Sequence, residues 1–393
     1  MIDKPTYLFL KQSATLQSYF GELCVDIPRS GETASVFSGI AGGQVGNVCF
    51  ETGPRYKRGS FGARAISWVA YFVGAVRFTF TVKGRPLLFI VAQPPFLPLI
   101  GYVQKKILGR RYVVWVDDVY PDVLVRRHVL RSNGWITRLW SAFNRVVLVN
   151  SEHVFTLGPH MLKVVQNYLT PGFPATIIPT WVDTDAIHPV PKLENAWAKE
   201  HGFEDKFTVM YSGNFGETHE VNLLLEAARQ LRSRSDLHFL LIGAGAKWEL
   251  IRKSVEEHDD ANVTVLPWQP VEVLSESLAS ADVSFVSLGE GIEGVSMPSK
   301  TYYAMATRCA IMASCVEQSD LAEVVTGAAC GVIVRPNVVE DIVSAIEYLS
   351  SHPVEMETYK ENARRAAVGA YSRKVNTRLV REIVERISHY EGR

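Results

Sequence analysis

The segment from Glu293 to Ala306, EGVSMPSKTYYAMA, holds the residue types best suited to chemistry in this chain. A carboxylate enters a turn that contains Gly294, a proline follows, and Lys300 stands in the first turn of the helix expected over 299–307. The N–H groups of such a turn and the N-terminus of a helix attract anions. The pattern therefore favours a phosphate-bearing ligand with hydroxyl groups that a carboxylate can orient. An ordinary strand-to-helix turn, with proline at the helix start, is the alternative.

Two further turns that contain glycines follow expected strands. Gly213 and Gly216 come after one strand, and Gly243 and Gly245 end the next strand along the chain. Small residues at such places let the backbone approach a pyrophosphate closely. Tight strand-to-helix turns would use the same residues, but two of them on successive strands favour ligand binding.

Alternating strands and helices must position these turns. The expected strands are Tyr7–Leu10, Thr33–Phe37, Val45–Phe50, Pro86–Ala92, Tyr112–Val116, His153–Leu157, Thr176–Ile178, Thr208–Ser212, His238–Ile242, Val263–Leu266, Val283–Val286, Ala310–Ala313 and Gly331–Val334. The expected helices are 61–78, 97–108, 134–150, 219–232, 246–257, 271–279, 299–307, 317–325, 338–351, 356–369 and 374–389. This α/β alternation indicates two doubly wound parallel sheets. Ligands bind beyond the carboxyl ends of such strands, so two facing sheets are expected to make an interdomain cleft.

Length and composition agree with two ordinary globular domains, because 393 residues can form two cores. The five cysteines are odd in number and form no CxxC pair, which favours reduced, cytosolic thiols over disulfides or a zinc site. No N-terminal signal peptide is expected, because the apolar run Tyr7–Leu10 is short. No metal-ligand cluster stands out, so we expect metal independence and no cofactor.

Charge is unevenly distributed. Residues 1–175 carry 20 Lys and Arg against 9 Asp and Glu, whereas the remainder carries 21 against 32. The N-terminal half should therefore face something anionic. Basic residues flank the apolar runs 66–73 and 96–100, which are too short to span a bilayer and favour an interfacial helix on an anionic membrane surface. A buried amphipathic helix with snorkelling arginines is the alternative, and no motif supports nucleic acid as the partner.

Two carboxylates follow the expected strand Tyr112–Val116. Asp118 and Asp122 should lie at the carboxyl end of the N-terminal sheet, where Asp118 could contact an acceptor hydroxyl. Capping of the next helix is the alternative role for both residues.

Several segments, taken in order, resemble glycosyltransferase family 4 of the GT-B fold. The matching runs are 209–219 followed by 223–228, 239–245 and 293–306, with 94–97, 118–122 and 178–185 in the N-terminal half. Within that family the chain is most similar to bacterial transferases that build O-antigen and exopolysaccharide. The resemblance covers roughly residues 45–390, and the combination of runs is more specific than any one of them.

The resemblance implies an acceptor-binding Rossmann-like domain over 1–185, a nucleotide-sugar-binding domain over 186–370 and a helix over 371–393 that packs back towards the N-terminal domain. It implies a catalytic group of Glu293, Lys300 and Asp118, in which Glu293 orients the donor sugar and Lys300 meets the diphosphate. The donor-binding residues would be Gly213, Asn214, Gly216, His219, Gly243, Gly245, Trp268, Gln269, Gly294, Val295, Ser296, Thr301 and Tyr303. Trp268 and Gln269 stand where relatives hold the base, although Trp268 could be a core residue.

The chain also departs from the family pattern. Relatives place an Arg and a Lys where this chain has Asn214 and His219, so the phosphate charge must be met elsewhere, most directly by Lys300. The second motif Glu is replaced by Thr301 when positions are counted and by Tyr303 when the following Ala-Met-Ala is aligned. The first loop, which is rich in glycine in relatives, has none in 11–14.

The expected function is that of a retaining glycosyltransferase, peripheral on the inner face of the cytoplasmic membrane, that moves a sugar from a nucleotide sugar to a lipid-linked or other glycan acceptor in cell-surface polysaccharide biosynthesis. Two alternatives remain open at this stage. The missing second Glu favours a non-catalytic GT-B protein that binds a nucleotide sugar or a partner, and the shared fold admits a sugar-nucleotide epimerase.

Overall fold

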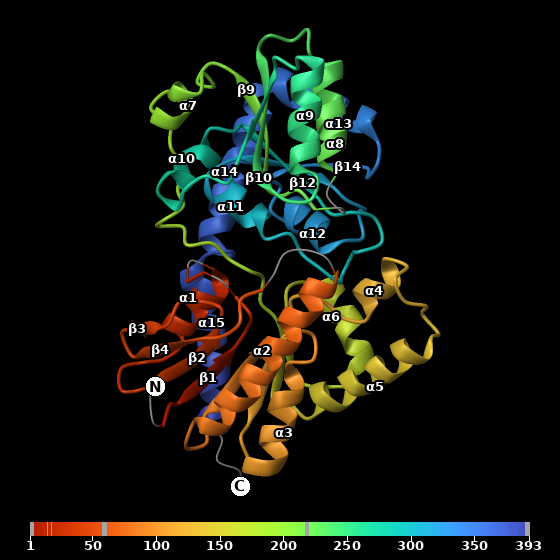
Figure 1. Cartoon of the computed structure of the whole chain (residues 1–393). Helices are drawn as coiled ribbons and strands as arrows, with labels where there is room; N and C mark the ends of the chain where they lie inside the picture. The colour runs from red at the N-terminus through yellow and green to blue at the C-terminus, as the bar shows by residue number, and fades with distance from the viewer. Residues whose placement is uncertain (1–3, 14, 17, 57–60, 217–219, 390–393) are drawn as a thin grey trace. The chain divides into compact units, whose positions relative to one another are not determined.

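The computed structural model describes residues 4–13, 15–16, 18–56, 61–216 and 220–389, and Figure 1 shows its helices and strands. The chain divides into two compact units. The first unit contains residues 1–179, 294–296 and 373–393, and the second contains 180–293 and 297–372. The sequence analysis placed its divisions after 185 and 370, whereas the two units divide after 179 and 372 and residues 294–296 fall in the first unit.

The described residues of the first unit form an eight-stranded sheet in the order β3-β4-β2-β1-β5-β6-β7-β8. Its strands are β1 (Tyr7–Leu10), β2 (Ala34–Ser38), β3 (Gly43–Val45), β4 (Val48–Thr52), β5 (Leu87–Val91), β6 (Tyr112–Trp115), β7 (His153–Thr156) and β8 (Ala175–Ile177). All five residues of β5 are buried, as expected for a central parallel strand covered on both faces. The pairs are parallel except for β3 with β4.

The antiparallel pair corrects one expectation. Val45–Phe50 was expected to be a single strand, but the structure ends β3 at Val45 and begins β4 at Val48. The two-residue turn between them starts at Gly46, whose φ of +57° is readily adopted by glycine. Gly-Asn is a hairpin turn signal, so the sequence contained the information.

Helices of the first unit include two that come from distant parts of the chain. The described helices of the first unit are α1 (Tyr19–Asp26), α2 (Phe61–Thr81), α3 (Pro98–Leu108), α4 (Asp122–Arg126), α5 (Trp135–Val149), α6 (Pro159–Val165), the 3-10 helix Gln166–Tyr168, and α15 (Arg373–His389); the distant pair is α1 and α15. In α2, Tyr71, Ala75 and Phe78 recur at helical spacing and are buried. The C-terminal helix α15 is tied to α1, because the Arg373 guanidinium donates to both carboxylate oxygens of Asp26 at 2.8 and 2.7 Å.

The described residues of the second unit form a six-stranded, wholly parallel sheet in the order β11-β10-β9-β12-β13-β14. Its strands are β9 (Phe207–Asn214), β10 (Leu237–Ala244), β11 (Val263–Leu266), β12 (Val283–Ser287), β13 (Ala310–Ser314) and β14 (Gly331–Val334). Its helices are α7 (Ala196–Glu200), α8 (Val221–Gln230), α9 (Trp248–His258), the 3-10 helix Val271–Val273, α10 (Leu274–Ala279), α11 (Lys300–Ala306), α12 (Asp320–Gly327), α13 (Val339–Ser351) and α14 (Pro353–Gly369). Apolar residues of α8 and α13, such as Leu224 and Ile346, share one buried cluster with Phe239 of β10.

Strand order locates the binding edge of each sheet. In the second unit β9 pairs with β10 on one side and with β12 on the other, so the order of strands reverses there. In the first unit the reversal lies between β1 and β5. Ligands of doubly wound sheets bind beyond the carboxyl ends of the strands at such reversals. The loops after β9 and β12, and those after β1 and β5, are therefore the first places to look for a site.

Candidate active site

The loops after β9 and β10 lie side by side, because the strands pair through Gly213 with Gly243 and through Asn214 with Ala244. A Cβ on Gly243 would stand 1.9 Å from the carbonyl oxygen of Gly213, and one on Gly245 would stand 2.8 Å from the nitrogen of Phe215. Gly243 and Gly245 also have φ of +149° and +147°. Only glycine fits both places. The structure thus brings these predicted glycine turns together as one closely packed pair of loops.

Lys300 reaches this pair of loops from the start of α11. A Cβ on Gly213 would lie 3.2 Å from the Lys300 Nζ, and that nitrogen is 3.8 Å from the centre of the Tyr211 ring. Among the residues that the structure describes, the buried Nζ has no hydrogen-bond partner. Burial lowers the pKa of Lys300 to about 7, because the charged form loses its hydration. An anion bound beside the Nζ would favour the charged form again.

The loop between β12 and α11 carries the other predicted groups of the second unit. Glu293 accepts a hydrogen bond from the Gly291 N–H at 2.8 Å. Thr301 is buried, and its hydroxyl donates to the Pro298 carbonyl at 2.8 Å, so this side chain is engaged within its own turn. Tyr303 is half-buried on α11. Neither position offers a carboxylate in place of the second family Glu.

A carboxylate that the sequence analysis did not select lies at the same edge. Glu220, just before α8, accepts hydrogen bonds from the Ser314 hydroxyl at 2.5 Å and from the Asn337 N–H at 3.3 Å. Its own N–H donates to the Ser287 hydroxyl at 3.3 Å. Burial raises the pKa of Glu220, and these hydrogen bonds and the charge of Lys247 oppose that rise. Glu220 therefore links the ends of β12 and β13 to the loop before α13.

Lys247 is a second cation that the sequence analysis missed. It stands two residues after Gly245, its backbone N–H donates to the Phe215 carbonyl at 3.0 Å, and its charge acts on Glu220. In sequence, Glu220 and Lys247 look like ordinary polar residues at helix starts. Only their placement at the carboxyl edge of one sheet distinguishes them.

The remaining predicted donor residues are spread along this edge. Trp268 follows β11, two strands from β9, and is 46 % exposed rather than part of the core. The side chain of Gln269 accepts from the Trp197 indole at 3.3 Å and donates to the Pro267 carbonyl at 3.0 Å. Asn214 is exposed at the end of β9 and Gly216 is half-buried, whereas the predicted His219 lies outside the described residues.

In the first unit, a network of hydrogen bonds holds Asp117 beside Asp118. Asp117 receives hydrogen bonds from Lys11 at 2.6 Å, from the Tyr19 hydroxyl at 2.5 Å and from the Trp115 indole at 3.0 Å. Lys11 follows β1 and Asp117 follows β6, so the network joins two carboxyl ends of the sheet. Burial and then the neighbouring Asp117 raise the pKa of Asp118 to about 6. Asp118 can therefore change its charge near neutral pH.

The predicted residues Gly294, Val295 and Ser296 belong to the first unit. The Val295 carbonyl accepts a hydrogen bond from the Val119 N–H at 3.0 Å. A Cβ on Gly294, where φ is +67°, would lie 2.9 Å from the His160 carbonyl carbon. Ser296 forms a hydrogen bond with the Asp118 side chain that opposes the rise of its pKa. These three residues are therefore placed with Asp118.

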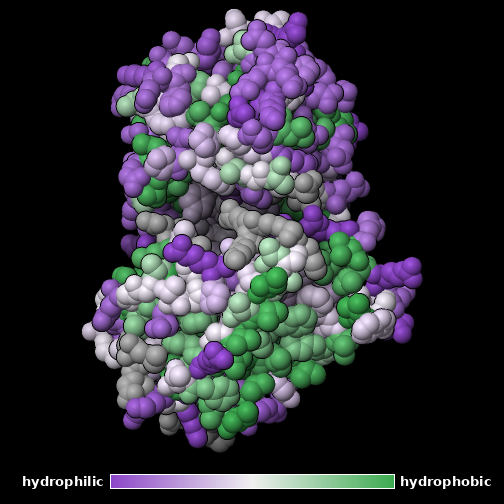
Figure 2. Space-filling view, viewed as in Figure 1, coloured by the Kyte–Doolittle hydropathy of each residue, from purple (hydrophilic) through white to green (hydrophobic). Residues whose placement is uncertain are grey.

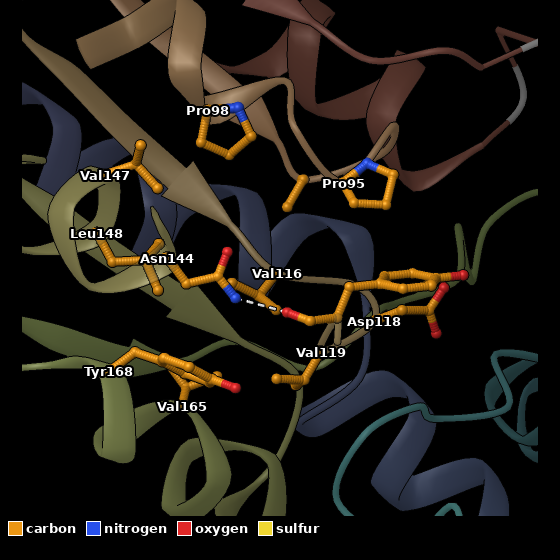
Figure 3. A pocket seen from close by; sticks show the side chains of 12 residues that line it. Pro95, Pro98, Val116, Asp118, Val119, Asn144, Val147, Leu148, Val165 and Tyr168 are labelled. Atoms are coloured by element: carbon orange, nitrogen blue, oxygen red, sulfur yellow. Dashed lines mark hydrogen bonds between the residues drawn. The ribbon is translucent and has the colours of Figure 1, made fainter. Parts of the chain in front are cut away.

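A small cavity of about 30 Å³ lies beside Asp118 (Figure 3). Its lining includes apolar residues of α5, Val147 and Leu148, with Asp118 at one end. Asn144 of α5 donates to the Tyr120 carbonyl at 2.5 Å, and so fixes the loop that carries Asp118. Asp122 accepts a hydrogen bond from the Tyr168 hydroxyl, which ties this second carboxylate to the protein interior.

The described residues hold neither a metal-ligand cluster nor a helix that could span a membrane. In that part of the chain, no group of three or more His, Cys, Asp and Glu is arranged to hold a metal ion. None of its helices combines the length and the apolar character that a membrane span requires.

The second unit is similar to known glycosyltransferases. Residues 194–366 match the family model described as glycosyl transferases group 1. The Pseudomonas aeruginosa protein WbjE, a probable glycosyltransferase, is 24 % identical over 333 residues, which are 84 % of this chain and 82 % of that protein. Escherichia coli (strain K12) WcaI, a candidate glycosyl transferase of colanic acid biosynthesis, is 26 % identical over 267 residues, which are 66 % of this chain and 65 % of that protein. The resemblance expected from the sequence is confirmed.

Fold comparison extends over the whole chain. The crystal structure of Anabaena HepE in complex with UDP and glucose has a TM-score of 0.69 and 15 % identity, and covers 97 % of this chain and 99 % of its own. At that identity the likeness concerns the fold. Together with two Rossmann-like parallel sheets and the family match, it confirms the GT-B fold class.

Proposed function

We propose that this chain, whose residues 194–366 match the family model of glycosyl transferases group 1, is a retaining glycosyltransferase that moves a sugar from a nucleotide sugar to a lipid-linked glycan acceptor. One observation carries the proposal. The amino group of Lys300 is buried against Gly213 and Tyr211, without a hydrogen-bond partner among the described residues. A buried cation at the binding edge of a parallel sheet is costly unless an anion completes it.

The anion that suits this place is the diphosphate of a nucleotide sugar. Gly213, Gly243 and Gly245 leave the two loops without side chains, so backbone amides can come close to phosphate oxygens. Lys300 would supply the charge that Asn214 cannot, and Lys247 is a second cation at the same edge. HepE was crystallised with UDP and glucose, which supports a uridine nucleotide as the first donor to test.

Catalysis would consist of positioning and charge stabilisation. As the bond between the sugar and the diphosphate breaks, negative charge grows on the leaving oxygen, and Lys300 with the amides of Gly213 and Gly216 would stabilise it; the Phe215 amide already donates to the Ala244 carbonyl. Glu293 would orient the donor sugar. The acceptor hydroxyl would attack the face from which the diphosphate leaves and pass its proton to that diphosphate, so that no protein nucleophile is needed and the configuration is retained.

Asp118 would hold the acceptor hydroxyl. Its neighbour Asp117 already accepts from Lys11, Tyr19 and Trp115, whereas Asp118 has a pKa near 6 and can accept a proton or a hydrogen bond at neutral pH. This role is a proposal about the first unit and is separable by experiment from the donor site.

The biological setting follows from the relatives and from charge. WcaI is named for colanic acid biosynthesis, which supports bacterial cell-surface polysaccharide as the product. The excess of Lys and Arg in residues 1–175 would attract anionic lipid, so we propose a peripheral place on the inner face of the cytoplasmic membrane. Metal independence is part of the proposal, and turnover should be unchanged by EDTA.

A non-catalytic nucleotide-sugar-binding protein is the second candidate. It is favoured by the absence of the second motif Glu, whose place is taken by Thr301 or by Tyr303, and Thr301 is already engaged with the Pro298 carbonyl. Calorimetric titration of a nucleotide-sugar panel tests the donor site directly. Binding of one nucleotide class that weakens in Lys300→Ala supports the donor site, which both candidates share, and absence of binding by the folded protein contradicts both. Transfer of the sugar to an acceptor separates the two candidates.

A further inference from the structure

A groove of about 870 Å³ lies in the first unit, where α2, the start of α3 and α5 meet. Its walls include Trp68, Val69 and Phe72 of α2, Leu99 of α3, and Trp140 and Phe143 of α5. Figure 2 shows hydrophobic residues gathered over the part of the surface where Figure 1 shows α2 and α3. The volume lies within the roughly 300–1,000 Å³ of sites that bind small molecules.

Aromatic stacking gives the groove firm walls. The Phe96 and Trp140 rings stack with centroids 4.5 Å apart, and Tyr120 stacks on Trp140 at 5.9 Å. Trp68 meets the edge of Tyr120 at 6.2 Å, so the wall continues from α5 to α2. Packed aromatic rings of this kind present a large apolar surface at little cost in side-chain entropy.

Two arginines of the lining lie near Tyr120. The lining given by the described residues includes Arg64 and Arg127 and no carboxylate. Both arginines lie close enough to Tyr120 to affect its phenol: burial and then Asp118 raise the pKa of Tyr120, whereas Arg127 and Arg64 lower it. Tyr120 and Pro95 line both this groove and the cavity beside Asp118. The two arginines are therefore near the part of the lining that adjoins the cavity of Asp118.

From this combination we propose that the groove binds the hydrocarbon chain of an isoprenoid phosphate or diphosphate acceptor, with the phosphate held by Arg64 and Arg127. The inference rests on the proposed function, because it assigns the acceptor's lipid part to a site in the same unit as Asp118. An apolar chain with an anionic head matches an apolar groove whose described charged lining residues are two arginines near Tyr120.

Two neighbouring residues on α2 allow binding in the groove to be distinguished from non-specific binding to the exposed apolar surface. Val69 lines the groove and is 63 % exposed, whereas Ile66, one turn earlier, is 70 % exposed and lies outside the lining. The same substitution can be made at both positions with little risk to folding. Val69→Trp fills the groove, and Ile66→Trp is its matched control on the open surface.

The test is titration of the full-length protein with farnesyl diphosphate, inorganic diphosphate and farnesol, followed by isothermal calorimetry without any nucleotide. We expect farnesyl diphosphate to bind more tightly than inorganic diphosphate, and Val69→Trp to weaken it by about tenfold while Ile66→Trp leaves it unchanged. Arg64→Ala and Arg127→Ala should lower the affinity for farnesyl diphosphate and leave the affinity for farnesol unchanged.

Two outcomes would overturn the inference. Equal effects of Val69→Trp and Ile66→Trp would show adhesion to the open surface, and equal affinities for farnesyl and inorganic diphosphate would show that the groove contributes nothing. Nucleotide binding is measured on the same preparations. If the protein binds nucleotide but not farnesyl diphosphate, the groove assignment is wrong and the proposed glycosyltransferase function is unaffected. If it binds farnesyl diphosphate but no nucleotide, the proposed function is wrong.

Discussion

The Nζ of Lys300 lies 3.8 Å from the centre of the Tyr211 ring, at the point where a Cβ on Gly213 would come within 3.2 Å of the same nitrogen. The face of the Tyr211 ring and the Cα of Gly213 shield one side of the amino group from water. A cation so placed is partly stabilised by the ring and strongly desolvated. This is the state expected of a group that completes its interactions only when an anion binds.

Removal of the Lys300 amino group should therefore mainly weaken the stabilisation of charge on the leaving diphosphate. Lys300→Met is expected to lower kcat by about 10²–10³-fold, the magnitude found when a single stabilising donor is removed from a charged transition state. Steady-state kinetics with the identified donor measure it. Lys253→Met, an exposed lysine on α9, is the matched control. An unchanged kcat in Lys300→Met would exclude this role.

Donor affinity should depend on pH through the same residue. Because burial lowers the pKa of Lys300 to about 7, the free protein carries the charge below that pH and loses it above. A nucleotide sugar keeps a constant diphosphate charge over this range, so its affinity should fall by about tenfold from pH 6 to pH 8. Calorimetry in two buffers should also show proton uptake at pH 8. The Lys300→Met variant should show neither effect, and a flat wild-type profile would contradict the assignment.

Gly213→Ala separates stability from binding at the donor site. The new Cβ would meet the flexible end of Lys300 rather than backbone, so Lys300 can move away. The free energy of unfolding should therefore change by less than about 1 kcal/mol. Nucleotide affinity should nevertheless fall, because the amino group is displaced. Gly243→Ala is the contrasting variant: its Cβ would overlap the Gly213 carbonyl, and strong destabilisation is expected in thermal unfolding. Normal affinity in a stable Gly213→Ala would argue against the Lys300 position.

Substitutions of the adjacent residues Asp117 and Asp118 should have different effects, the first on stability and the second on turnover. Asp117→Asn leaves the buried Lys11 amino group without its carboxylate, and should destabilise the protein by about 3–5 kcal/mol in chemical denaturation. Asp118→Asn should preserve stability and lower acceptor-dependent turnover. Because the pKa of Asp118 is raised to about 6, the wild-type rate should rise as the pH passes 6, and the Asp118→Asn rate should not. Parallel effects of the two substitutions would remove the distinction.

Local patterns were enough to predict most of the framework. Val263–Leu266 and Gly331–Val334 form strands with the predicted ends, because short β-branched runs between turns can be recognised without tertiary information. The single strand expected over Val45–Phe50 was wrong, since a hairpin turn at Gly46 was overlooked. The site was less accessible to prediction. Lys300 could be selected from its motif, but its contact with Tyr211 could not.

Contacts between distant segments explain what was missed. Lys11 and Asp117 are 106 positions apart, and Glu220 acquires its environment from Ser314, 94 positions away. The apolar groove draws its walls from three helices that no local pattern relates to one another. These features depend on the order of strands and on the packing of helices, which sequence periodicity alone does not determine.

The most direct test of the central claim is product analysis with the identified nucleotide sugar and a polyprenyl-diphosphate-linked acceptor, comparing wild type with Glu293→Ala and Lys300→Ala. We predict a glycosylated lipid in which the anomeric configuration of the donor is retained, with much less product from both variants. Recovery of an isomerised donor, or of unchanged donor from a folded protein that binds both substrates, would contradict the assignment as a glycosyltransferase.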